Sequence, residues 1–552
     1  MMCSDQHPLP RALVALSLAL PALAGVWALL HRFYHDDAYI ALAYARNLLA
    51  GHGLVWNSGE RVEGYTSLLW VLGCAGLGRA GLDLELASRL LGVVSLLALF
   101  LVLAQREGRA GAWTCLLLST AGPLVAWSIG GLETVGFTVL LTVSLLVAER
   151  LTDAIAQGEI SDRGGATRSG FALLPVVAGL LFAVSELCRP EAFLFSALAA
   201  SMLIAMALRR DRDSGGGLFL AGLLIAGFAV VFVPRLAWRL HYYGDLFPNT
   251  FYVKTGSGHG LSDLASGVKY LLRFVLYFPG AALLPVAALW TGWRKRPLRA
   301  GERMVAASLL VYLAYVAWVG GDHMPWFRFL VPALPLAFLL SIRRLEEASC
   351  ARGRKGRLGL MLVLSVAAAN LVSTSWLAVR QGWLWRDPAA RSGALVGEYI
   401  RDHWPQDALV ALNTAGSTAY FSQRRCIDML GLNDRHIARR RMPEAPTRLP
   451  WARLPGHHKG DGGYVLSRQP DFIILGGSEG YAQPWFVGDL EIYEDPEFQA
   501  GYVIRETLIP GRDATRPLRF RYYERTAPRT VPRPVPPAIT AARFDAPDAR
   551  GV

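Results

Sequence analysis

Two adjacent carboxyl groups, Asp36 and Asp37, follow the first long apolar segment of the sequence. A charged carboxylate costs several kcal/mol in apolar surroundings unless it is paired or solvated, so a neighbouring pair at such a boundary requires an explanation. In a functional interpretation, each carboxylate raises the pKa of the other, and one of them acts as a general base toward a hydroxyl group. In a structural interpretation, the pair only caps the end of a helix.

Cationic and polar side chains in other loops indicate what the second reactant would be. Arg, Lys or His beside a phosphate leaving group stabilises the negative charge that develops on it. We expect a donor phosphate or its sugar to contact the following polar residues: Arg61, Glu63, Tyr65, Arg239, His241, Asn249, Lys254, His323 and Arg328. For each cation taken alone, the alternative is a role in membrane topology or snorkelling to the interface.

The composition indicates that a membrane surrounds most of the chain. Hydrophobic residues make up 53% and charged residues only 18%, whereas charged residues alone approach a quarter in soluble proteins. Apolar windows that fit the roughly 20 residues of a membrane-spanning helix lie near 12–30, 64–80, 86–104, 112–128, 132–149, 171–188, 191–208, 217–237, 270–290, 304–319, 329–342 and 358–378. We interpret the window at 64–80 as re-entrant or interfacial, which leaves about eleven transmembrane helices.

The distribution of basic residues predicts the orientation of these helices. Lys and Arg are more frequent in the loops on one side, which therefore faces the cytoplasm. With a retained first helix at 12–30, the N-terminus is cytoplasmic and the chain after residue 378 lies outside. The net charge of +13 follows from this loop pattern and does not indicate a nucleic acid partner.

The polar C-terminal part of the chain predicts a separate domain. We expect a transmembrane domain over residues 1–378, an extracytoplasmic mixed α/β domain over 379–525 and a Pro-rich disordered tail over 526–552. Within the α/β domain, 392–404 has a helical pattern, and the apolar runs at 408–412 and 471–475 are typical of strands.

Two motifs of the α/β domain carry polar residues that could face an acceptor or the membrane domain. They are LNTAGSTAYFS (412–422) and GHHKGDGGY (456–464), and the candidates are Asn413, His457, His458, Lys459 and Asp461. The alternative for the second motif is a tight structural turn with exposed charge. The six cysteines contain no CxxC pair, and neither a P-loop nor a GxGxxG turn is present, so no metal or nucleotide site is predicted.

The segment DDAYIALAYARNLLAGHGLVWNSGERVEGYTSLLW (36–70), together with RPEA, YYGDLFPNTFYVKTG, GGDHMPWFRFLVP and GHHKGDG, resembles a known family. It is similar to the C-type-fold membrane glycosyltransferases that include the mycobacterial terminal β-(1→2)-arabinofuranosyltransferase and its proteobacterial relatives. The resemblance implies a bacterial inner-membrane enzyme with an outward active site, and a polyprenyl-phosphate sugar as the donor. It also implies an acidic base that maps onto Asp36 or Asp37, and inversion at the anomeric carbon.

The same resemblance leaves the substrates open. A pentofuranose such as arabinofuranose is the leading expectation for the transferred sugar, and a cell-envelope glycan is expected to accept it. No cofactor is required by this chemistry, and a divalent metal is not indicated. Two alternatives are a lipid or glycan transporter and a non-catalytic envelope or motility factor on the same fold. A transporter would place polar residues near the bilayer midplane, whereas here they gather in the loops of one side.

Overall fold

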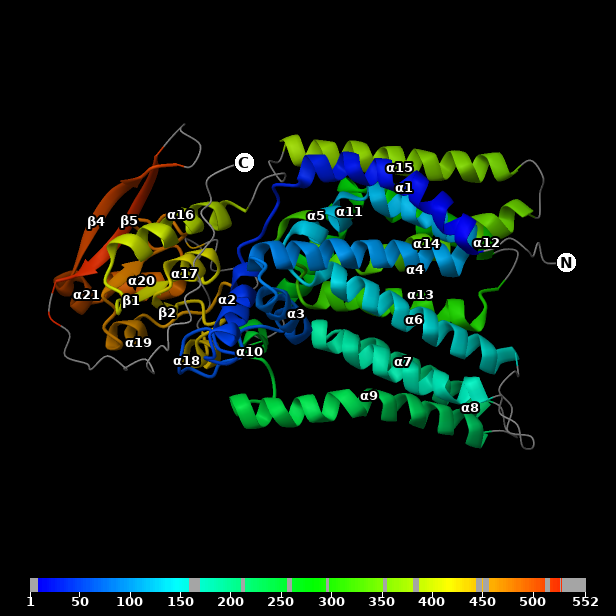
Figure 1. The fold of residues 1–552 in the computed structure, drawn as a ribbon, viewed down its shortest axis with the longest axis horizontal. Helices are drawn as coiled ribbons and strands as arrows, with labels where there is room; N and C mark the ends of the chain where they lie inside the picture. The colour runs from blue at the N-terminus through cyan, green and yellow to red at the C-terminus, as the bar shows by residue number, and fades with distance from the viewer. Residues whose placement is uncertain are drawn as a thin grey trace.

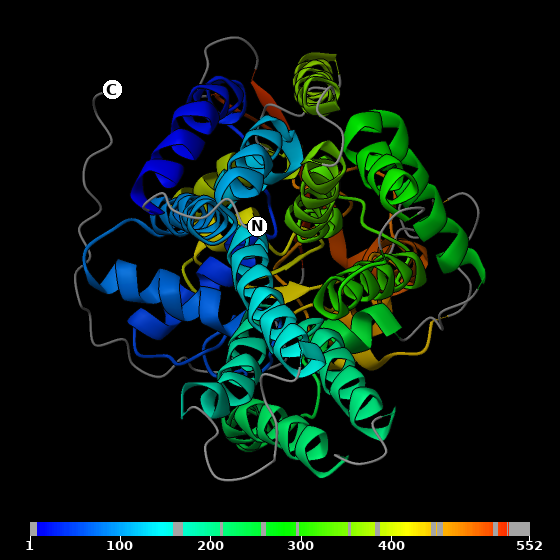
Figure 2. The same ribbon diagram turned by 90° about the vertical axis from the view of Figure 1, so that its right-hand side faces the viewer.

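The computed structural model describes residues 8–157, 169–209, 214–255, 261–293, 297–350, 355–380, 387–442, 449, 456–511, 517–526 and 528. Long helices form a bundle, and an α/β domain lies against one end of it (Figure 1). Viewed from the opposite end, most of the bundle helices are seen nearly along their axes (Figure 2). Apart from Thr526 and Pro528, the tail predicted to be disordered lies outside the described residues.

Apolar sequence forms the helices of the bundle. They are α1 (Pro8–Leu30), α4 (Leu84–Thr120), α5 (Gly122–Ile129), α6 (Thr134–Gln157), α7 (Ser169–Cys188), α8 (Ala192–Arg209), α9 (Ser214–Tyr243), α11 (Leu261–Tyr277), α12 (Pro279–Trp293), α13 (Ala300–Trp318), α14 (Ala333–Cys350) and α15 (Lys355–Arg380). The shorter elements near the α/β domain are α2 (Ala38–Leu49), α3 (Leu68–Arg79), α10 (Asn249–Thr255) and the 3-10 helix η1 (Pro325–Leu330).

Helix α4 is a hairpin of two arms, because the chain reverses at Gly108. This glycine has φ 53° and ψ −118°, a conformation that costs a residue with a side chain far more than glycine. The Cys115 thiol donates to the Phe100 carbonyl at 3.5 Å, whereas 15 residues of straight helix would separate them by roughly 22 Å. The two arms correspond to the windows predicted at 86–104 and 112–128, and α5 continues the second arm.

The number of membrane crossings stays a prediction. In the described part of the chain, five helices are long and apolar enough to cross a bilayer, or six if the bent pair α11 and α12 forms one span. Those two helices meet at 99°, so the window predicted at 270–290 is not one straight helix. Pro279 explains the break, because proline lacks the N–H that would continue α11. Helix α3, with 12 residues, is too short to cross.

The C-terminal domain has a five-stranded sheet in the order β2-β1-β3-β5-β4. The strands are β1 (Leu409–Leu412), β2 (Arg425–Asp428), β3 (Phe472–Ile474), β4 (Tyr502–Ile509) and β5 (Leu518–Arg525). The first three are mutually parallel, and β5 pairs antiparallel with both β3 and β4. This sheet, with the helices around it, confirms the predicted mixed α/β domain.

Alternation along the strands gives the domain two apolar faces. Val410 and Leu412 belong to the core that contains α16 (Pro388–His403) and α17 (Ser417–Ser422) and is continuous with the membrane domain. Leu409 and Ala411 pack in a second core with residues of α18 (Arg435–Arg439), α19 (Gly462–Ser467), α20 (Val487–Glu494) and α21 (Pro496–Gly501). The helical pattern predicted at 392–404 and the strand-like runs at 408–412 and 471–475 thus lie on α16, β1 and β3.

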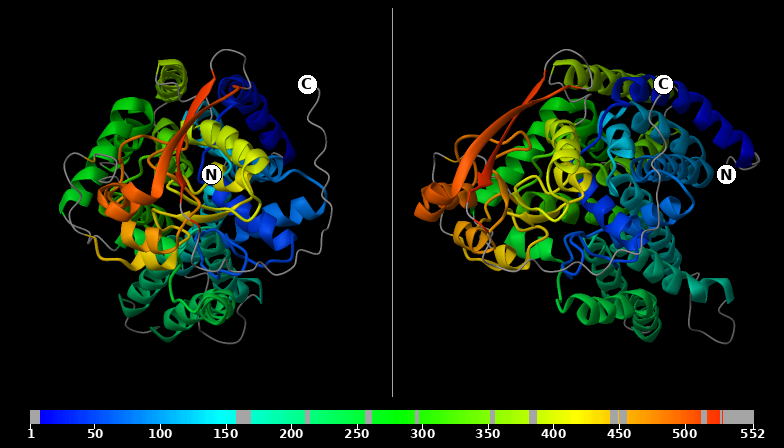
Figure 3. Two further views of the ribbon diagram at one scale, coloured as in Figure 1. Left: turned by 90° about the vertical axis from the view of Figure 1, so that its left-hand side faces the viewer. Right: turned by 60° about the vertical axis from the view of Figure 1, so that its left-hand side comes forward.

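Polar contacts fix the α/β domain to the end of the bundle, where it covers the helices in Figure 3 (left). The Asn249 amide, at the start of α10, donates to the carbonyls of Gly431, Leu432 and Asp434 at 2.8, 3.1 and 3.1 Å. The Asp387 N–H donates to the Tyr34 carbonyl at 3.0 Å. The loops that carry the motifs of the membrane domain therefore meet the α/β domain at one end of the molecule.

Candidate active site

A cavity of about 1890 Å³ lies between the end of the bundle and the α/β domain. Its walls come from the loop before α2, the α7–α8 loop, the end of α9, α10, the α13–α14 segment and the domain itself. Of the predicted site residues, those on its wall are Asp36, Asp37, Tyr65, Arg239, Lys254, His323, Arg328, Asn413, His457 and His458. Tertiary structure therefore brings together residues that lie far apart in the sequence.

Asp36 connects the two domains. Ser417, at the start of α17, donates its backbone N–H and its hydroxyl to Asp36 Oδ1 at 2.8 and 2.5 Å. Burial, followed by the nearby Asp387 carboxylate, raises the pKa of Asp36 to about 6, and the Ser417 hydrogen bonds oppose this shift. Gly416 is needed beside it, because a Cβ there would collide with the Asp36 carbonyl and carboxylate.

Asp37 differs from its neighbour because its carboxylate accepts no hydrogen bond from the described residues. It precedes α2 without capping it through its side chain, and it is half-buried on the cavity wall. Its backbone N–H donates to His35 Nδ1 at 3.2 Å. Its charge acts on His323 across the cavity: burial lowers the pKa of His323, while Asp322 and Asp37 oppose that shift. Asp37 is therefore available to a substrate hydroxyl.

The arginines of the cavity wall are held by carboxylates. Arg328 Nε lies 2.9 Å from Asp322 Oδ2. Arg189, between α7 and α8, contacts Glu133 at 3.0 Å and Glu191 at 2.6 Å. Burial tends to raise the pKa of Asp322, but Arg328 and then His323 outweigh it, and the resulting pKa is about 2. These ion pairs keep cations in place on the cavity wall, and each positive charge is balanced by a carboxylate.

Lys254 is the exception among the cavity cations in the described part of the chain. Its ammonium group makes no hydrogen bond or ion pair with a described residue, although protein surrounds the cavity into which it extends. Burial, followed by Arg328, lowers the pKa of Lys254, while Asp322 and Glu191 oppose this shift. An unpaired ammonium beside Arg328 is suited to an anionic ligand such as a phosphate.

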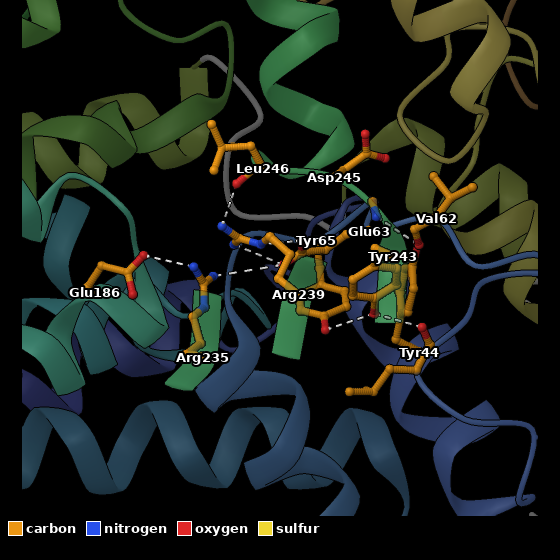
Figure 4. A network of polar contacts seen from close by, with 12 residues as sticks. Tyr44, Val62, Glu63, Tyr65, Glu186, Arg235, Arg239, Tyr243, Asp245 and Leu246 are labelled. Carbon is orange, nitrogen blue, oxygen red and sulfur yellow. Dashed lines mark hydrogen bonds and ion pairs between the residues drawn. The ribbon is translucent and has the colours of Figure 1, made fainter. Parts of the chain in front are cut away.

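Glu63 is the centre of a buried ionic network (Figure 4). Its carboxylate lies 2.6 Å from Arg239 Nε and 3.8 Å from Arg235 Nη2. Arg235 also contacts Glu186 at 3.1 Å. The Tyr65 hydroxyl lies 3.1 Å from the Tyr243 hydroxyl in the same region. This network holds the loop at 60–65 against α9, so Glu63 supports the cavity wall from behind and Arg239 and Tyr65 form part of its surface.

Four of the residues expected to bind the donor do not line the cavity: Glu63, which lies behind its wall, and Arg61, His241 and Asn249. Arg61 is exposed and lies over the Tyr242 ring, 4.7 Å from its centroid. His241 is exposed at the end of α9. The Asn249 amide is used to bind the loop after β2 of the α/β domain. Arg61 and His241 are exposed and do not line the cavity, which sequence proximity to Glu63 and Arg239 cannot reveal.

The candidate residues of the α/β domain also fall into two groups, those at the cavity and those that stabilise a turn. Asn413 is buried on the cavity wall and donates to Asp489 Oδ1 at 2.8 Å, and His457 lies 4.7 Å from His323, between ring centroids. Lys459 instead donates to the Arg440 carbonyl at 2.6 Å. Asp461 caps α19 by accepting from the Tyr464 N–H at 2.9 Å. Lys459 and Asp461 therefore stabilise the turn, as in the structural alternative.

Several wall residues were not among the site candidates. They are Glu133, Glu186, Asp322, Asp387 and Ser417, of which all but Ser417 line the cavity directly. Three of them lie in the segments GLET (131–134), ELCRPEA (186–192) and GGDHMP (320–325), so the signal was an acidic residue in a loop on the side predicted to face outward. Nothing in the sequence links Ser417 to Asp36, because the pair is separated by 381 residues.

The described side chains include no group of three or more His, Cys, Asp or Glu residues arranged to hold a metal ion. That the chemistry needs neither metal nor cofactor remains a prediction.

Comparison with solved structures identifies the fold. ArnT from Cupriavidus metallidurans, bound to undecaprenyl phosphate, aligns with a TM-score of 0.52 at 16% identity, over 74% of this chain and 84% of that chain. The oligosaccharyltransferase of Archaeoglobus fulgidus, in complex with Zn and sulfate, aligns with a TM-score of 0.52 at 14% identity, over 76% and 62%. The chain has the C-type glycosyltransferase fold. This C-type fold, with several apolar helices and a C-terminal α/β domain, confirms the predicted fold class.

Curated relatives confirm the resemblance seen in the sequence. Two proteins named terminal β-(1→2)-arabinofuranosyltransferase match this chain. The one from Corynebacterium glutamicum is 26% identical over 405 residues, which cover 64% of this chain and 53% of that protein. The one from Mycobacterium tuberculosis is 30% identical over 311 residues, which cover 51% and 45%. The chain thus spans about half the length of the curated relatives it matches.

A family model matches the C-terminal part of this chain. Residues 384–527 match a domain of unknown function (DUF8728). This range contains every helix and strand from α16 to β5 and therefore coincides with the α/β domain that closes the cavity.

Proposed function

We propose that the protein is an inverting glycosyltransferase. It moves a sugar from a polyprenyl-phosphate donor to a cell-envelope glycan on the outer face of the bacterial inner membrane. A pentofuranose such as arabinofuranose is the leading expectation for the sugar, in keeping with the names of the curated relatives. The observation that carries the proposal is the unpaired Asp37 carboxylate, which shares one cavity with the unpaired Lys254 ammonium.

In the proposed reaction, Asp37 accepts the proton of the acceptor hydroxyl. The hydroxyl oxygen attacks the anomeric carbon on the face opposite the lipid phosphate, and a new glycosidic C–O bond forms. The C–O bond to the phosphate breaks with its electron pair, and polyprenyl phosphate leaves. General-base assistance of this kind contributes about a hundredfold or more to the rate.

The cations of the cavity would stabilise the leaving phosphate. Lys254 has no competing partner among the described residues, so its ammonium would contact the phosphate directly. Arg328, held by Asp322 at 2.9 Å, and His323 lie beside it and would contribute to the same positive field. Because Asp322 fixes Arg328 before any ligand binds, little reorganisation is needed when the charge develops.

The deciding experiment compares Asp37→Asn with Asp36→Asn in the full chain, purified in detergent. The assay is transfer of arabinofuranose from polyprenyl-phosphoryl arabinofuranose to an arabinofuranosyl oligosaccharide. We expect Asp37→Asn to lose at least about a hundredfold in kcat, as for removal of a general base. Asp36→Asn should retain more activity, since its amide oxygen can still accept from Ser417.

A matched control is Asp402→Asn, because Asp402 is an exposed carboxylate at the end of α16, away from the cavity. It should transfer sugar as the wild type does. If Asp37→Asn keeps wild-type kcat, the proposed mechanism is incorrect. If the wild type is inert with several lipid-linked sugars, the transporter and non-catalytic alternatives replace the proposal.

A further inference from the structure

We infer that the loop at 476–486 of the α/β domain is the binding subsite for the acceptor, and that it takes a neutral oligosaccharide. The inference rests on the proposed function, because it assigns the acceptor a place beside Asp37. It also gives a role to the domain that closes the cavity. Four features of the loop support it: its anchoring, its aromatic pair, a carboxylate without a partner among the described residues, and its position.

The loop is anchored at both ends by one buried carboxylate. Asp489 Oδ2 accepts from the N–H groups of Gly476, Trp485 and Phe486 at 2.9, 3.1 and 3.2 Å. The other oxygen, Oδ1, accepts from Asn413 at 2.8 Å. Asp489 is fully buried on α20, so the loop is held against the rigid part of the domain. A binding surface held in this way loses little conformational entropy when a ligand binds.

An aromatic pair of this loop faces the cavity. The rings of Tyr481 and Trp485 are stacked, with centroids 4.2 Å apart and planes 13° from parallel. Both side chains are half-buried and line the cavity. Gly476, with φ 73°, lies under Tyr481, and a Cβ at that position would collide with the ring. The flat apolar surface of such a pair fits the C–H face of a sugar ring, in a pocket that also needs a few polar groups.

The polar group of the loop is an acceptor without a donor among the described residues. Glu479, between Ser478 and the aromatic pair, lines the cavity, and its carboxylate makes no hydrogen bond or ion pair with a described residue. An acceptor without a donor in a partly enclosed site is costly, so a ligand that brings hydroxyl donors would satisfy this carboxylate.

The position of the loop places such a ligand next to the proposed base. The Ser478 hydroxyl donates to the Ala389 carbonyl at 3.2 Å, and the Ser417 hydroxyl oxygen lies 3.1 Å from the same carbonyl oxygen. Ser417 in turn binds Asp36, which precedes Asp37. A sugar bound at Tyr481, Trp485 and Glu479 would therefore direct a hydroxyl toward Asp37. Because Glu479 is a carboxylate, a neutral sugar is favoured over one that carries acidic groups.

The test uses an arabinofuranosyl tetrasaccharide as the probe and the full chain in detergent. Saturation-transfer difference NMR measures binding directly, and the transfer assay measures KM for the tetrasaccharide and for the donor separately. We expect Glu479→Gln and Trp485→Ala each to weaken binding and to raise the acceptor KM by about tenfold, as for loss of a central aromatic or charged hydrogen-bonding contact. The donor KM should not change.

Glu497→Gln and Tyr493→Ala are the matched controls, because both side chains are exposed on the same domain outside the cavity. Glu479→Gln preserves volume, so it separates loss of binding from misfolding of the Trp485 variant. Wild-type acceptor binding and KM in both loop variants would overturn the subsite. A wild type that transfers no sugar but binds the tetrasaccharide through Glu479 and Trp485 would overturn the proposed function and retain the subsite. Absence of both binding and transfer would overturn both.

Discussion

Ser417 donates both its backbone N–H and its hydroxyl to one carboxylate oxygen of Asp36, at 2.8 and 2.5 Å, across the junction of the two domains. The loop that carries Asp36 and Asp37 is thereby fixed to the α/β domain. Asp36 is used for positioning, and Asp37 remains available to a substrate. Two adjacent residues of the same type thus have different surroundings, and the predictions below follow from that difference.

Replacing Asp36 by Ala is expected to loosen the junction. Both Ser417 donors would lose their acceptor, and loss of a hydrogen bond to a charged group costs about 1.5–3 kcal/mol. The midpoint of thermal unfolding should fall, and limited proteolysis between α15 and α16 should become faster. Asp37→Ala, whose carboxylate accepts no bond from the described residues, is the matched control and should unfold as the wild type does. Equal unfolding temperatures for the two variants would contradict the positioning role.

Gly416→Ala is expected to disturb the same contact from the other side. The new Cβ would collide with the carbonyl and carboxylate of Asp36, so the loop must shift. The effect expected at Gly416 therefore follows from the lack of space beside Asp36. Sugar transfer should fall by about tenfold or more, as for a small displacement of a catalytic group. Gly501→Ala, where a Cβ meets nothing within 4 Å, should leave transfer unchanged.

Lys254→Gln is expected to weaken donor binding selectively. The variant removes the unpaired ammonium, and a charged hydrogen bond of this kind contributes about tenfold or more to affinity. The donor KM should rise, and inhibition by added undecaprenyl phosphate should weaken in parallel, with the acceptor KM unchanged. Lys269→Gln, an exposed lysine on α11, provides the control. An unchanged inhibition constant for undecaprenyl phosphate would exclude direct contact between Lys254 and the phosphate.

The Glu63–Arg239 ion pair should be far more important for stability than an exposed pair. Both side chains are almost fully buried, at 2% and 6% exposure, so Glu63→Gln leaves buried arginines uncompensated at a cost of about 3–5 kcal/mol. The double variant Glu63→Gln/Arg239→Gln should lose less than the sum of the single variants in thermal unfolding. For comparison, Glu524→Gln removes the exposed partner of Arg505 and should cost about 1 kcal/mol at most. Strict additivity at the buried pair would show that the two residues are not coupled.

The α/β domain is expected to become less stable as the pH rises from about 4 to about 6. Burial raises the pKa of Asp428 and of Asp489 from 3.8 to about 6. The folded state therefore binds these protons more tightly than the unfolded state, and the stabilisation is complete only below the ordinary pKa. A shift of this size corresponds to about 3 kcal/mol for each group. Asp322, with a pKa of about 2, titrates below this range.

Thermal unfolding between pH 4 and pH 7 measures this dependence. Asp428→Asn should flatten the curve, because one of the carboxyl groups with a raised pKa no longer titrates. Glu497→Gln, in which an exposed carboxylate is replaced, should leave the slope as it is in the wild type. A stability that rises with pH across this range would show that these carboxyl groups are stabilised in their charged form.

The sequence by itself determined the class of protein and the parts that local pattern controls. Its apolar runs predicted the helices of the bundle, because a helix that contacts lipid must satisfy its backbone internally and be apolar along its length. Periodicity predicted α16, β1 and β3, and the clustering of charged residues in the loops of one side predicted an outward site. Each of these patterns is local, because it can be recognised in a short stretch of the sequence.

Tertiary structure decided what each polar residue does. Only packing shows that Asp36 is bound by Ser417, that Lys254 lacks a partner among the described residues, and that Arg61 lies over the Tyr242 ring and not on the cavity wall. The reversal at Gly108 likewise appears only when the two arms of α4 are seen side by side. The physical reason is that the pairing and pKa of a charged group depend on neighbours a few ångströms away, and these neighbours come from distant parts of the chain.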